Sequence, residues 1–179
     1  CYGGNADMDD CGVCGGDGSS YDYFDVTDIV LLVEAILENT WSSDNLHCSD
    51  FNGDGYLDII DVVQIVEFIL GDARMTDATE VTLIKDGSSL ILEAGGFVGA
   101  IKMTLAHGEN FLIELTDESM VSDYRTNGTQ TTVIIAAPQA GDLLTATSEF
   151  VIEDVMAVTS SGELKVNMPS TFSLTSAYP

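Results

Sequence analysis

The sequence predicts an α+β protein in which a repeated helical unit is followed by an antiparallel β-sandwich. Residues 25–37 and 58–70 repeat each other with a period of 33 residues and place apolar residues at helical spacing. From about Val81 the pattern changes to short β-branched or alternating runs. We expect three segments: a Cys, Asp and Gly-rich stretch over 1–20, a loop-and-helix unit over 21–77 whose first loop starts near 17, and the sandwich over 78–179.

The chain is strongly acidic, with 30 acidic and 5 basic residues and a formal net charge of −25. This field repels nucleic-acid phosphates and anionic lipid, so it excludes binding of either through a basic patch. Residues 1–77 hold 17 of the acids and a single base, Arg74. Bound cations would relieve the self-repulsion, and Ca²⁺ is the natural candidate. A surface that is merely acidic and soluble is the alternative, and only the spacing of the acids distinguishes the two.

The first segment has no apolar periodicity, so we expect an irregular stretch held by disulfides and ions. Four cysteines allow two disulfides in three pairings and favour an oxidising, extracellular or cell-surface location. A redox or zinc pair at Cys11 and Cys14 is the alternative, but no second close CxxC follows it. The chain starts at Cys1 without a signal peptide, so we expect a processed piece; no apolar run reaches the about 18 residues of a membrane span. The four cysteines are Cys1, Cys11, Cys14 and Cys48.

The repeat predicts two helices that pack on each other. Asp25 and Asp58 stand where a helix N-cap would, and Gly71 is placed to end the second helix. Equivalent apolar positions follow each cap, and we expect nearly all of them in the core. These are Ile29, Leu32, Val33, Ile36 and Leu37 in the first copy and Val62, Ile65, Val66, Ile69 and Leu70 in the second.

Short runs separated by turn residues predict the strands of the sandwich. The expected strands are 81–84, 90–92, 100–105, 111–115, 131–135, 148–152, 154–158 and 163–167.

The segment Asp50–Asp61 has the spacing of a calcium loop, with oxygen-bearing residues at positions 1, 3, 5, 9 and 12 and Gly55 at the sharp turn. Calcium takes six to eight hard oxygen ligands. We expect side-chain ligands from positions 1, 3, 5 and 12, a carbonyl from position 7, and position 9 to bind directly or through water. A metal-free turn rich in Asp and Asn is the alternative. The predicted ligands are Asp50, Asn52, Asp54, Tyr56, Asp58 and Asp61.

Asp61 stands where an ordinary EF-hand has Glu, and no clear helix enters the loop, so residues 17–71 resemble the type I dockerin family. That resemblance implies a duplicated calcium loop. The first copy departs from the motif, because Tyr21 replaces an acid and Asp22 replaces the turn glycine. The sequence therefore leaves open whether this loop binds an ion. Its candidate ligands are Asp17, Ser19, Tyr23, Asp25 and Asp28, and alternating Asn5, Asp7 and Asp9 form a further candidate calcium segment upstream.

The dockerin resemblance also implies a cohesin-like protein partner that meets the exposed faces of residues 28–38 and 61–70. The pairs Ile29-Val30 and Val62-Val63 either determine that partner or are buried against the sandwich. Residues 96–105 and 131–138 resemble the cohesin sandwich, and Asp10–Asp17 resembles repeats of secreted bacterial proteins. Residues 172–179 resemble the junction before a type IX sorting tail, which implies export.

No nucleophile with a base, catalytic carboxylate pair or histidine cluster is present in the sequence, so we predict a protein that is not an enzyme. His47 and His107 are expected as surface residues, and Asn127 begins either a glycosylation sequon or an Asn-Gly turn. The favoured function is a secreted, calcium-binding structural or interaction module that assembles head-to-tail with copies of itself into an extracellular fibre or matrix. The alternatives are the attachment module of a larger secreted hydrolase, or a carbohydrate-binding sandwich. The last is less favoured, because the single Trp of the chain, Trp41, lies outside the predicted sandwich.

Overall fold

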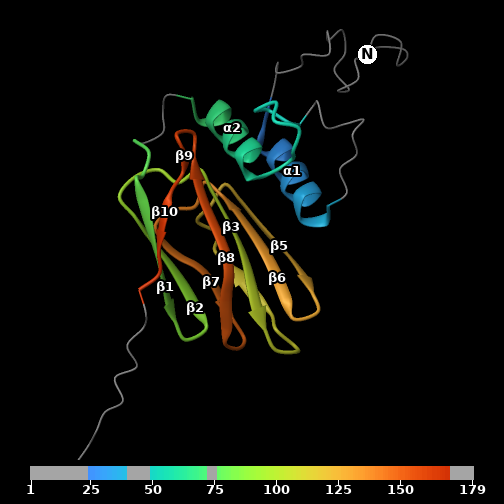
Figure 1. The fold of residues 1–179 in the computed structure, drawn as a ribbon, viewed down its shortest axis with the longest axis vertical. Coiled ribbons are helices and arrows are strands. Elements are labelled where there is room, and N and C mark those ends of the chain that lie inside the picture. Colours follow the sequence, from blue (N-terminus) through green and yellow to red (C-terminus); the bar gives the residue numbers. More distant parts are fainter. Residues whose placement is uncertain (1–23, 40–48, 72–75, 170–179) are drawn as a thin grey trace, which may run out of the picture.

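The computed structural model describes residues 24–39, 49–71 and 76–169, which form two helices followed by ten strands (Figure 1). Helices α1 and α2 span Val26–Glu38 and Ile59–Leu70. The strands are β1 Glu80–Asp86, β2 Ser89–Ala94, β3 Ala100–His107, β4 Ile113–Leu115, β5 Val121–Asn127, β6 Gln130–Ala136, β7 Gly141–Ala146, β8 Phe150–Thr159, β9 Gly162–Glu163 and β10 Lys165–Asn167. Among these residues no helix is long and apolar enough to cross a membrane.

Both helices begin and end where their sequences predict. Asp25 and Asp58 are the N-caps, and each accepts a hydrogen bond from the backbone two residues further on. The backbone N–H of each cap residue in turn donates to the side chain of the aspartate three positions later, Asp28 or Asp61. This reciprocal pair of bonds is a capping box. Asn39 ends α1 in the left-handed region with φ 51°, and Gly71 ends α2 with φ 53°.

The strands form two five-stranded sheets that face each other as a β-sandwich. The first sheet has the order β10-β1-β2-β7-β4, and the second has the order β5-β6-β3-β8-β9. The paired strands are antiparallel, as expected, except that β10 pairs with β1 in parallel. β10 follows β9 of the second sheet and crosses to the edge of the first, where it arrives running in the same direction as β1.

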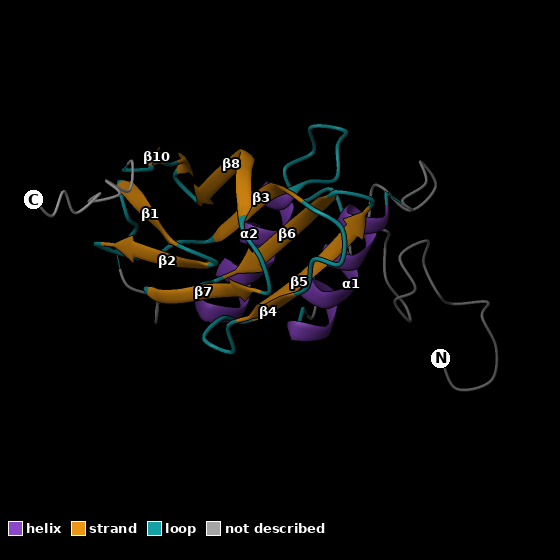
Figure 2. Cartoon of the chain, turned by 90° about the horizontal axis from the view of Figure 1, so that it is seen from below, coloured by secondary structure: helices purple, strands orange, loops and turns teal. Residues whose placement is uncertain are grey.

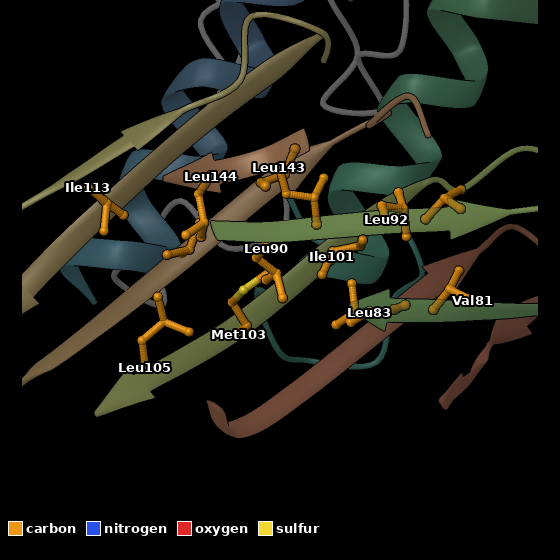
Figure 3. Packing of buried hydrophobic residues seen from close by; sticks show 14 of the residues in the cluster. Val81, Leu83, Leu90, Leu92, Ile101, Met103, Leu105, Ile113, Leu143 and Leu144 are labelled. Atoms are coloured by element: carbon orange, nitrogen blue, oxygen red, sulfur yellow. The ribbon is translucent and has the colours of Figure 1, made fainter. Parts of the chain in front are cut away.

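Alternating side chains fill the space between the sheets with one apolar cluster. Leu83, Leu90 and Leu92 from the first sheet meet Ile101 and Met103 from the second, and Figure 3 shows them pointing toward one another. All five are at most 2% exposed. Burial on this scale is the main force that holds the two sheets together.

The helix pair forms a third layer on the outer face of the second sheet (Figure 2). A second apolar cluster joins Ile29 and Val33 of α1 and Val62 of α2 to Ile134 and Val158 of the sheet. The ends of β3 and β6 that lie under the helices are therefore buried on both faces. Of the pairs Ile29-Val30 and Val62-Val63, only Val30 is exposed, at 37%. Of the two alternatives for these pairs, burial against the sandwich therefore holds for the other three residues.

Several strands differ from the sequence expectation. The expected strand 163–167 is divided, because Glu163 ends β9 of the second sheet and Lys165–Asn167 form β10 at the edge of the first. The expected runs 148–152 and 154–158 form the single strand β8, because the register against β3 shifts between Thr104 and Leu105 and leaves Glu153 as a bulge. The bulge moves the inward-facing side chains from Phe150 and Ile152 to Val155 and Ala157, so the pattern resembles two strands.

Strands β5 and β7 were not expected. β5 is an edge strand with mostly polar residues. In β7 the adjacent residues Leu143 and Leu144 are both buried, because the register against β2 shifts there, so its burial does not alternate.

Candidate calcium site

The loop from Asp50 to Asp61 is folded around the carboxylate at its first position. Asp50 Oδ1 accepts the backbone N–H groups of Gly53 at 2.8 Å and Asp54 at 3.1 Å, and Oδ2 accepts that of Gly55 at 2.8 Å. Gly53 and Gly55 have φ values of +71° and +86°, in the left-handed region that favours glycine. The two glycines therefore let the chain turn tightly enough to wrap this side chain.

Short Asx turns place the next polar side chains along the same loop. Asn52 Oδ1 accepts the Asp54 N–H at 2.8 Å, and Asp54 Oδ1 accepts the Tyr56 N–H at 2.8 Å. The Asn52 amide also donates to Asp54 Oδ2 at 2.9 Å. The side-chain oxygens of Asn52 and Asp54 thus each accept a hydrogen bond from the backbone N–H two residues further along the loop. The Tyr56 side chain is exposed.

Asp61, at position 12, is completely buried and connects the loop to α2. Its Oδ1 accepts the Phe51 N–H at 2.8 Å and the Asn52 N–H at 3.4 Å, and its Oδ2 accepts the Asp58 N–H at 2.9 Å. Burial raises the pKa of this carboxyl against the opposing effect of the three N–H donors, and the nearby Asp58 charge raises it further. The three N–H donors offset part of the cost of burying this carboxylate.

The first copy of the repeat has the same geometry where the structure describes it. The Thr27 N–H donates to Asp25 Oδ1 at 2.6 Å, and the Asp25 N–H donates to Asp28 Oδ2 at 2.8 Å. Hydrogen bonds from the Thr27 side chain and from the Thr27 backbone N–H lower the pKa of the exposed Asp25 carboxyl. Positions 9 and 12 therefore have the same hydrogen-bonded arrangement in both copies.

Aromatic rings connect the two copies, a feature that the sequence reading missed. Phe24, at position 8 of the first loop, lies edge-on to Phe51, at position 2 of the second, with ring centroids 4.7 Å apart. Phe24 also meets Phe68 of α2 at 5.6 Å. The available signal in the sequence was the pair of aromatic residues Phe24 and Phe51. Their contact joins the residue before the α1 N-cap to the loop Asp50–Asp61.

The donor chemistry of the loop fits a hard cation, although its carboxylates do not converge on one point. Within the described ranges no three His, Cys, Asp or Glu side chains lie close enough to share a metal ion. The loop carboxylates instead accept backbone N–H groups, and each carboxylate offers about four acceptor positions, so capacity for an ion remains. The ion pairs that the structure describes, such as Arg125 with Glu38, lie outside the loop. Only oxygen donors line it, which is the set that Ca²⁺ prefers.

Several predicted residues lie outside the described part of the chain. These are Asn5, Asp7, Asp9, Asp17, Ser19 and Tyr23, together with Tyr21, Asp22, the four cysteines, Trp41, His47 and residues 172–179.

Two further sequence candidates are explained by the sandwich itself. His107 donates from Nδ1 to the Gly108 carbonyl and accepts at Nε2 from the Thr131 hydroxyl, both at 2.8 Å, so both of its ring nitrogens are engaged. Asn127 pairs with Gln130 at the end of β5, and Gly128, with φ 63°, begins the two-residue turn of the hairpin.

No protein-family model matches the chain, and no curated protein sequence matches it. Among solved structures, a non-cellulosomal cohesin from the hyperthermophilic archaeon Archaeoglobus fulgidus is similar to it, with a TM-score of 0.35 and 17% identity. That match covers 51% of this chain and 86% of the cohesin chain. The function proposed for this protein rests on its own loop, helices and sheets.

Proposed function

We propose that the chain is an extracellular, non-catalytic protein-interaction module whose helix pair is stabilised by Ca²⁺ bound in the loop Asp50–Asp61. The observation that carries this proposal is the oxygen-only loop closed around Asp50 and the buried Asp61, with glycines at its two left-handed positions. Asp50, Asn52, Asp54 and Asp61 would supply side-chain oxygens, Tyr56 its carbonyl, and Asp58 a direct or water-mediated contact.

A bound ion would act on stability through the helix that the loop precedes. Asp58 caps α2 and Asp61 lies in its first turn, so both belong to the loop and to the helix. A ligand that binds only the folded state adds about 2.7 kcal/mol at a concentration 100 times its dissociation constant. Calcium would also neutralise part of the charge of −25.

Thermal unfolding of the full chain, with Ca²⁺ and with a chelator, tests this proposal. Wild type should unfold at a clearly higher temperature with Ca²⁺, and Asp54→Asn should lose most of that increase, because one ligand charge is removed while the side chain keeps its shape. Asp142→Asn is the matched control, since Asp142 is an exposed carboxylate on β7, outside the loop. An equal calcium effect in all three proteins would contradict a site in this loop.

A second candidate function is head-to-tail assembly in which the helix pair of one copy covers the second sheet of the next. One observation favours it: the helix pair and the sheet share a continuous apolar cluster, and neither surface would be stable in water alone. Exchange of an identical element between copies keeps every contact of that cluster, and a heterologous exchange that does not close forms a fibre.

The ion pair between Arg125 of β5 and Glu38 of α1, 2.7 Å apart, provides the test of exchange. In Arg125→Lys a zero-length carbodiimide reagent can join the new lysine to Glu38, whereas the arginine of wild type does not react. A ladder of covalent multimers for the variant alone would support exchange between copies. Crosslinked monomer alone would show that each helix pair stays on its own sheet and would overturn this second function, while leaving calcium binding untouched.

A further inference from the structure

Strand β5 forms an open edge of the second sheet. It pairs with β6 from Val121 to Asn127, and no strand in the described part of the chain pairs with its other side. Figure 1 shows it as the outermost strand of that sheet. An unpaired strand edge is a template for a strand of another chain. The side chains of β5 determine which chain can pair there.

The backbone of Tyr124 points away from β6. Asn127 and Gln130 flank the two-residue turn between the strands, so they form a hydrogen-bonded pair. Hydrogen-bonding groups alternate along an antiparallel strand, and Tyr124, three residues before Asn127, therefore directs its N–H and C=O outward. In agreement, the Tyr124 N–H donates to the adjacent side chain, Asp123 Oδ1, at 2.8 Å. A strand that arrived at this edge would replace that local bond.

The two charged side chains of β5 lie on its helix-facing side. Val121 belongs to the apolar cluster beneath the helices, so Asp123 and Arg125 share that face of the strand. Arg125 Nη1 donates there to Glu38 of α1 at 2.7 Å. A cleft of about 230 Å³ lies between α1 and β5 at these residues, so the helix leaves room beside both charges.

The sequence of β5 is complementary to itself in one antiparallel register. When two copies meet about a two-fold axis at Tyr124, each Asp123 stands opposite the Arg125 of the other copy. The Cα atoms of such a non-hydrogen-bonded pair are only about 4.5 Å apart, which brings the opposite charges close together. An axis at Asp123 would oppose two aspartates, and an axis at Arg125 would oppose two arginines. Charge therefore selects the register centred on Tyr124.

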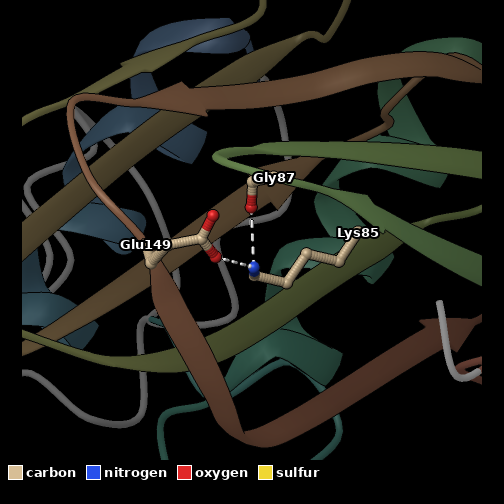
Figure 4. A network of polar contacts seen from close by, with 3 residues as sticks. All are labelled: Lys85, Gly87 and Glu149. Carbon is tan, nitrogen blue, oxygen red and sulfur yellow. Dashed lines mark hydrogen bonds and ion pairs between the residues drawn. The ribbon is translucent and has the colours of Figure 1, made fainter. Parts of the chain in front are cut away.

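The charge of the whole molecule favours β5 over β8 as the edge that meets a second copy. Two chains with a net charge of −25 repel each other, so a contact between them needs local charge balance. β5 has one acid and one base. β8, whose outer edge is only partly covered by β9, has two acids, Glu153 and Asp154, and no base. Beside β8, Lys85 Nζ is already bound to Glu149 Oε2 and the Gly87 carbonyl, each at 2.6 Å (Figure 4).

We propose that the open edge of β5 is an interface at which two copies of this chain pair antiparallel about a two-fold axis at Tyr124. The pairing joins two five-stranded sheets into one continuous sheet, and Arg125 lies between its own Glu38 and the Asp123 of the other copy. This inference rests on the interaction module proposed above and names its partner, but it does not involve the loop Asp50–Asp61. A two-fold contact closes at the dimer, whereas head-to-tail exchange of the helix pair continues to larger assemblies.

Sedimentation velocity of the full chain and of two charge variants of β5 tests this interface. Wild type should form a dimer. Asp123→Arg opposes arginines to arginines, and Arg125→Asp opposes aspartates to aspartates, so each variant alone should dimerise about tenfold more weakly or worse. An equimolar mixture of the two variants should recover the dimer, because every arginine then meets an aspartate. Recovery in the mixture also establishes that both variants are folded.

Four outcomes would overturn the proposal. A wild type that stays monomeric at every concentration would show that the edge does not pair. Equal association of wild type and both variants would place the contact elsewhere. A mixture that associates as weakly as the single variants would contradict the register. Association that rises in Asp123→Arg and falls in Arg125→Asp would follow net charge alone. None of these outcomes affects the calcium-dependent unfolding temperature, so the two proposals fail separately.

Discussion

Gly99 lies where α2 meets the second sheet, and no larger residue fits there. A Cβ atom at this position would stand 2.7 and 2.8 Å from the two methyl groups of Val63 and 3.0 Å from the Val158 carbonyl oxygen. Val63 is branched and buried at 1% exposure, so its methyl groups cannot move away. The close approach of helix and sheet therefore depends on this glycine.

Gly99→Ala should destabilise the protein by about 1 to 3 kcal/mol, the usual cost of adding a methyl group to a packed core. Gly108→Ala is the control, because nothing lies within 4 Å of a Cβ placed there. Chemical denaturation of both variants measures the free energy of unfolding. Equal stability of the two variants would contradict the tight packing of α2 on the sheet.

Glu80 predicts a pH dependence for the pairing of β10 with β1. Its Oε2 accepts from Asn167 Nδ2 at 3.0 Å and Lys165 Nζ at 3.2 Å, and these bonds lower the pKa of the Glu80 carboxyl from its ordinary value of 4.5. A carboxyl whose pKa is lower in the folded state stabilises the fold above the unfolded pKa, and this stabilisation is lost as the pH falls through the folded pKa.

Glu80→Gln should therefore be less stable than wild type at neutral pH, and the difference should vanish below the lowered pKa of Glu80. The effect is small because the groups are exposed to solvent. Denaturation midpoints measured from neutral to acid pH give the comparison. A difference that persists unchanged at the lowest pH would assign the effect to shape rather than to charge.

At the residue scale, the sequence predicted the helix caps but not the environment of the loop carboxylates. Asp25 and Asp58 stand before helical repeats, and a local rule is sufficient to identify them as N-caps. The hydrogen bond from Phe51 to Asp61 spans ten residues, and the contact of Phe24 with Phe51 spans two loops. Such contacts depend on the packed structure and leave no local pattern.

At the element scale, adjacent residues of β6 serve two different cores. Ile134 faces the helix pair, and Ile135 faces the first sheet. Either change to Ala should cost about 2 to 5 kcal/mol. In Ile134→Ala the amides of α1 and α2 should show the largest increase in hydrogen exchange, whereas Ile135→Ala should affect both sheets. The same exchange pattern in both variants would contradict two separate clusters.

The elements that sequence reasoning identified have strong periodicity, and those that it missed do not. The helices follow from a 33-residue repeat with helical spacing. Strand β5 escaped detection because Val121 is its only buried residue, and an edge strand needs little apolar patterning. The bulge at Glu153 divided β8 into two apparent strands, because a single extra residue inverts the alternation.

At the scale of the whole molecule, the sequence indicated a helical part and a sandwich. It left open whether the apolar helix faces meet a partner or the sandwich. Strands buried on both faces have nearly continuous apolar residues, and this pattern does not reveal what covers each face. The run Val133–Ala136, buried throughout, shows this ambiguity. Only the structure shows that the helix pair covers the outer face of β3, β6 and β8.

The net charge of −25 predicts that salt stabilises the molecule in a general way. Sodium chloride near physiological ionic strength should raise the unfolding temperature of wild type and Asp54→Asn equally, since screening does not depend on the loop. Calcium at matched ionic strength should add a further increase in wild type alone. Thermal unfolding in the two salts separates these effects, and an equal response to both salts would reduce the calcium effect to screening.

Calorimetric titration of the full chain with Ca²⁺, compared with Asp50→Asn, tests the central claim most directly. Other acidic segments of the chain are candidate sites, so the difference in stoichiometry between the two proteins is the informative quantity. The proposed site at Asp50–Asp61 predicts that Asp50→Asn binds one ion fewer than wild type, while Asp142→Asn binds the same number as wild type. Identical stoichiometry and affinity in all three proteins would contradict a calcium site at Asp50–Asp61.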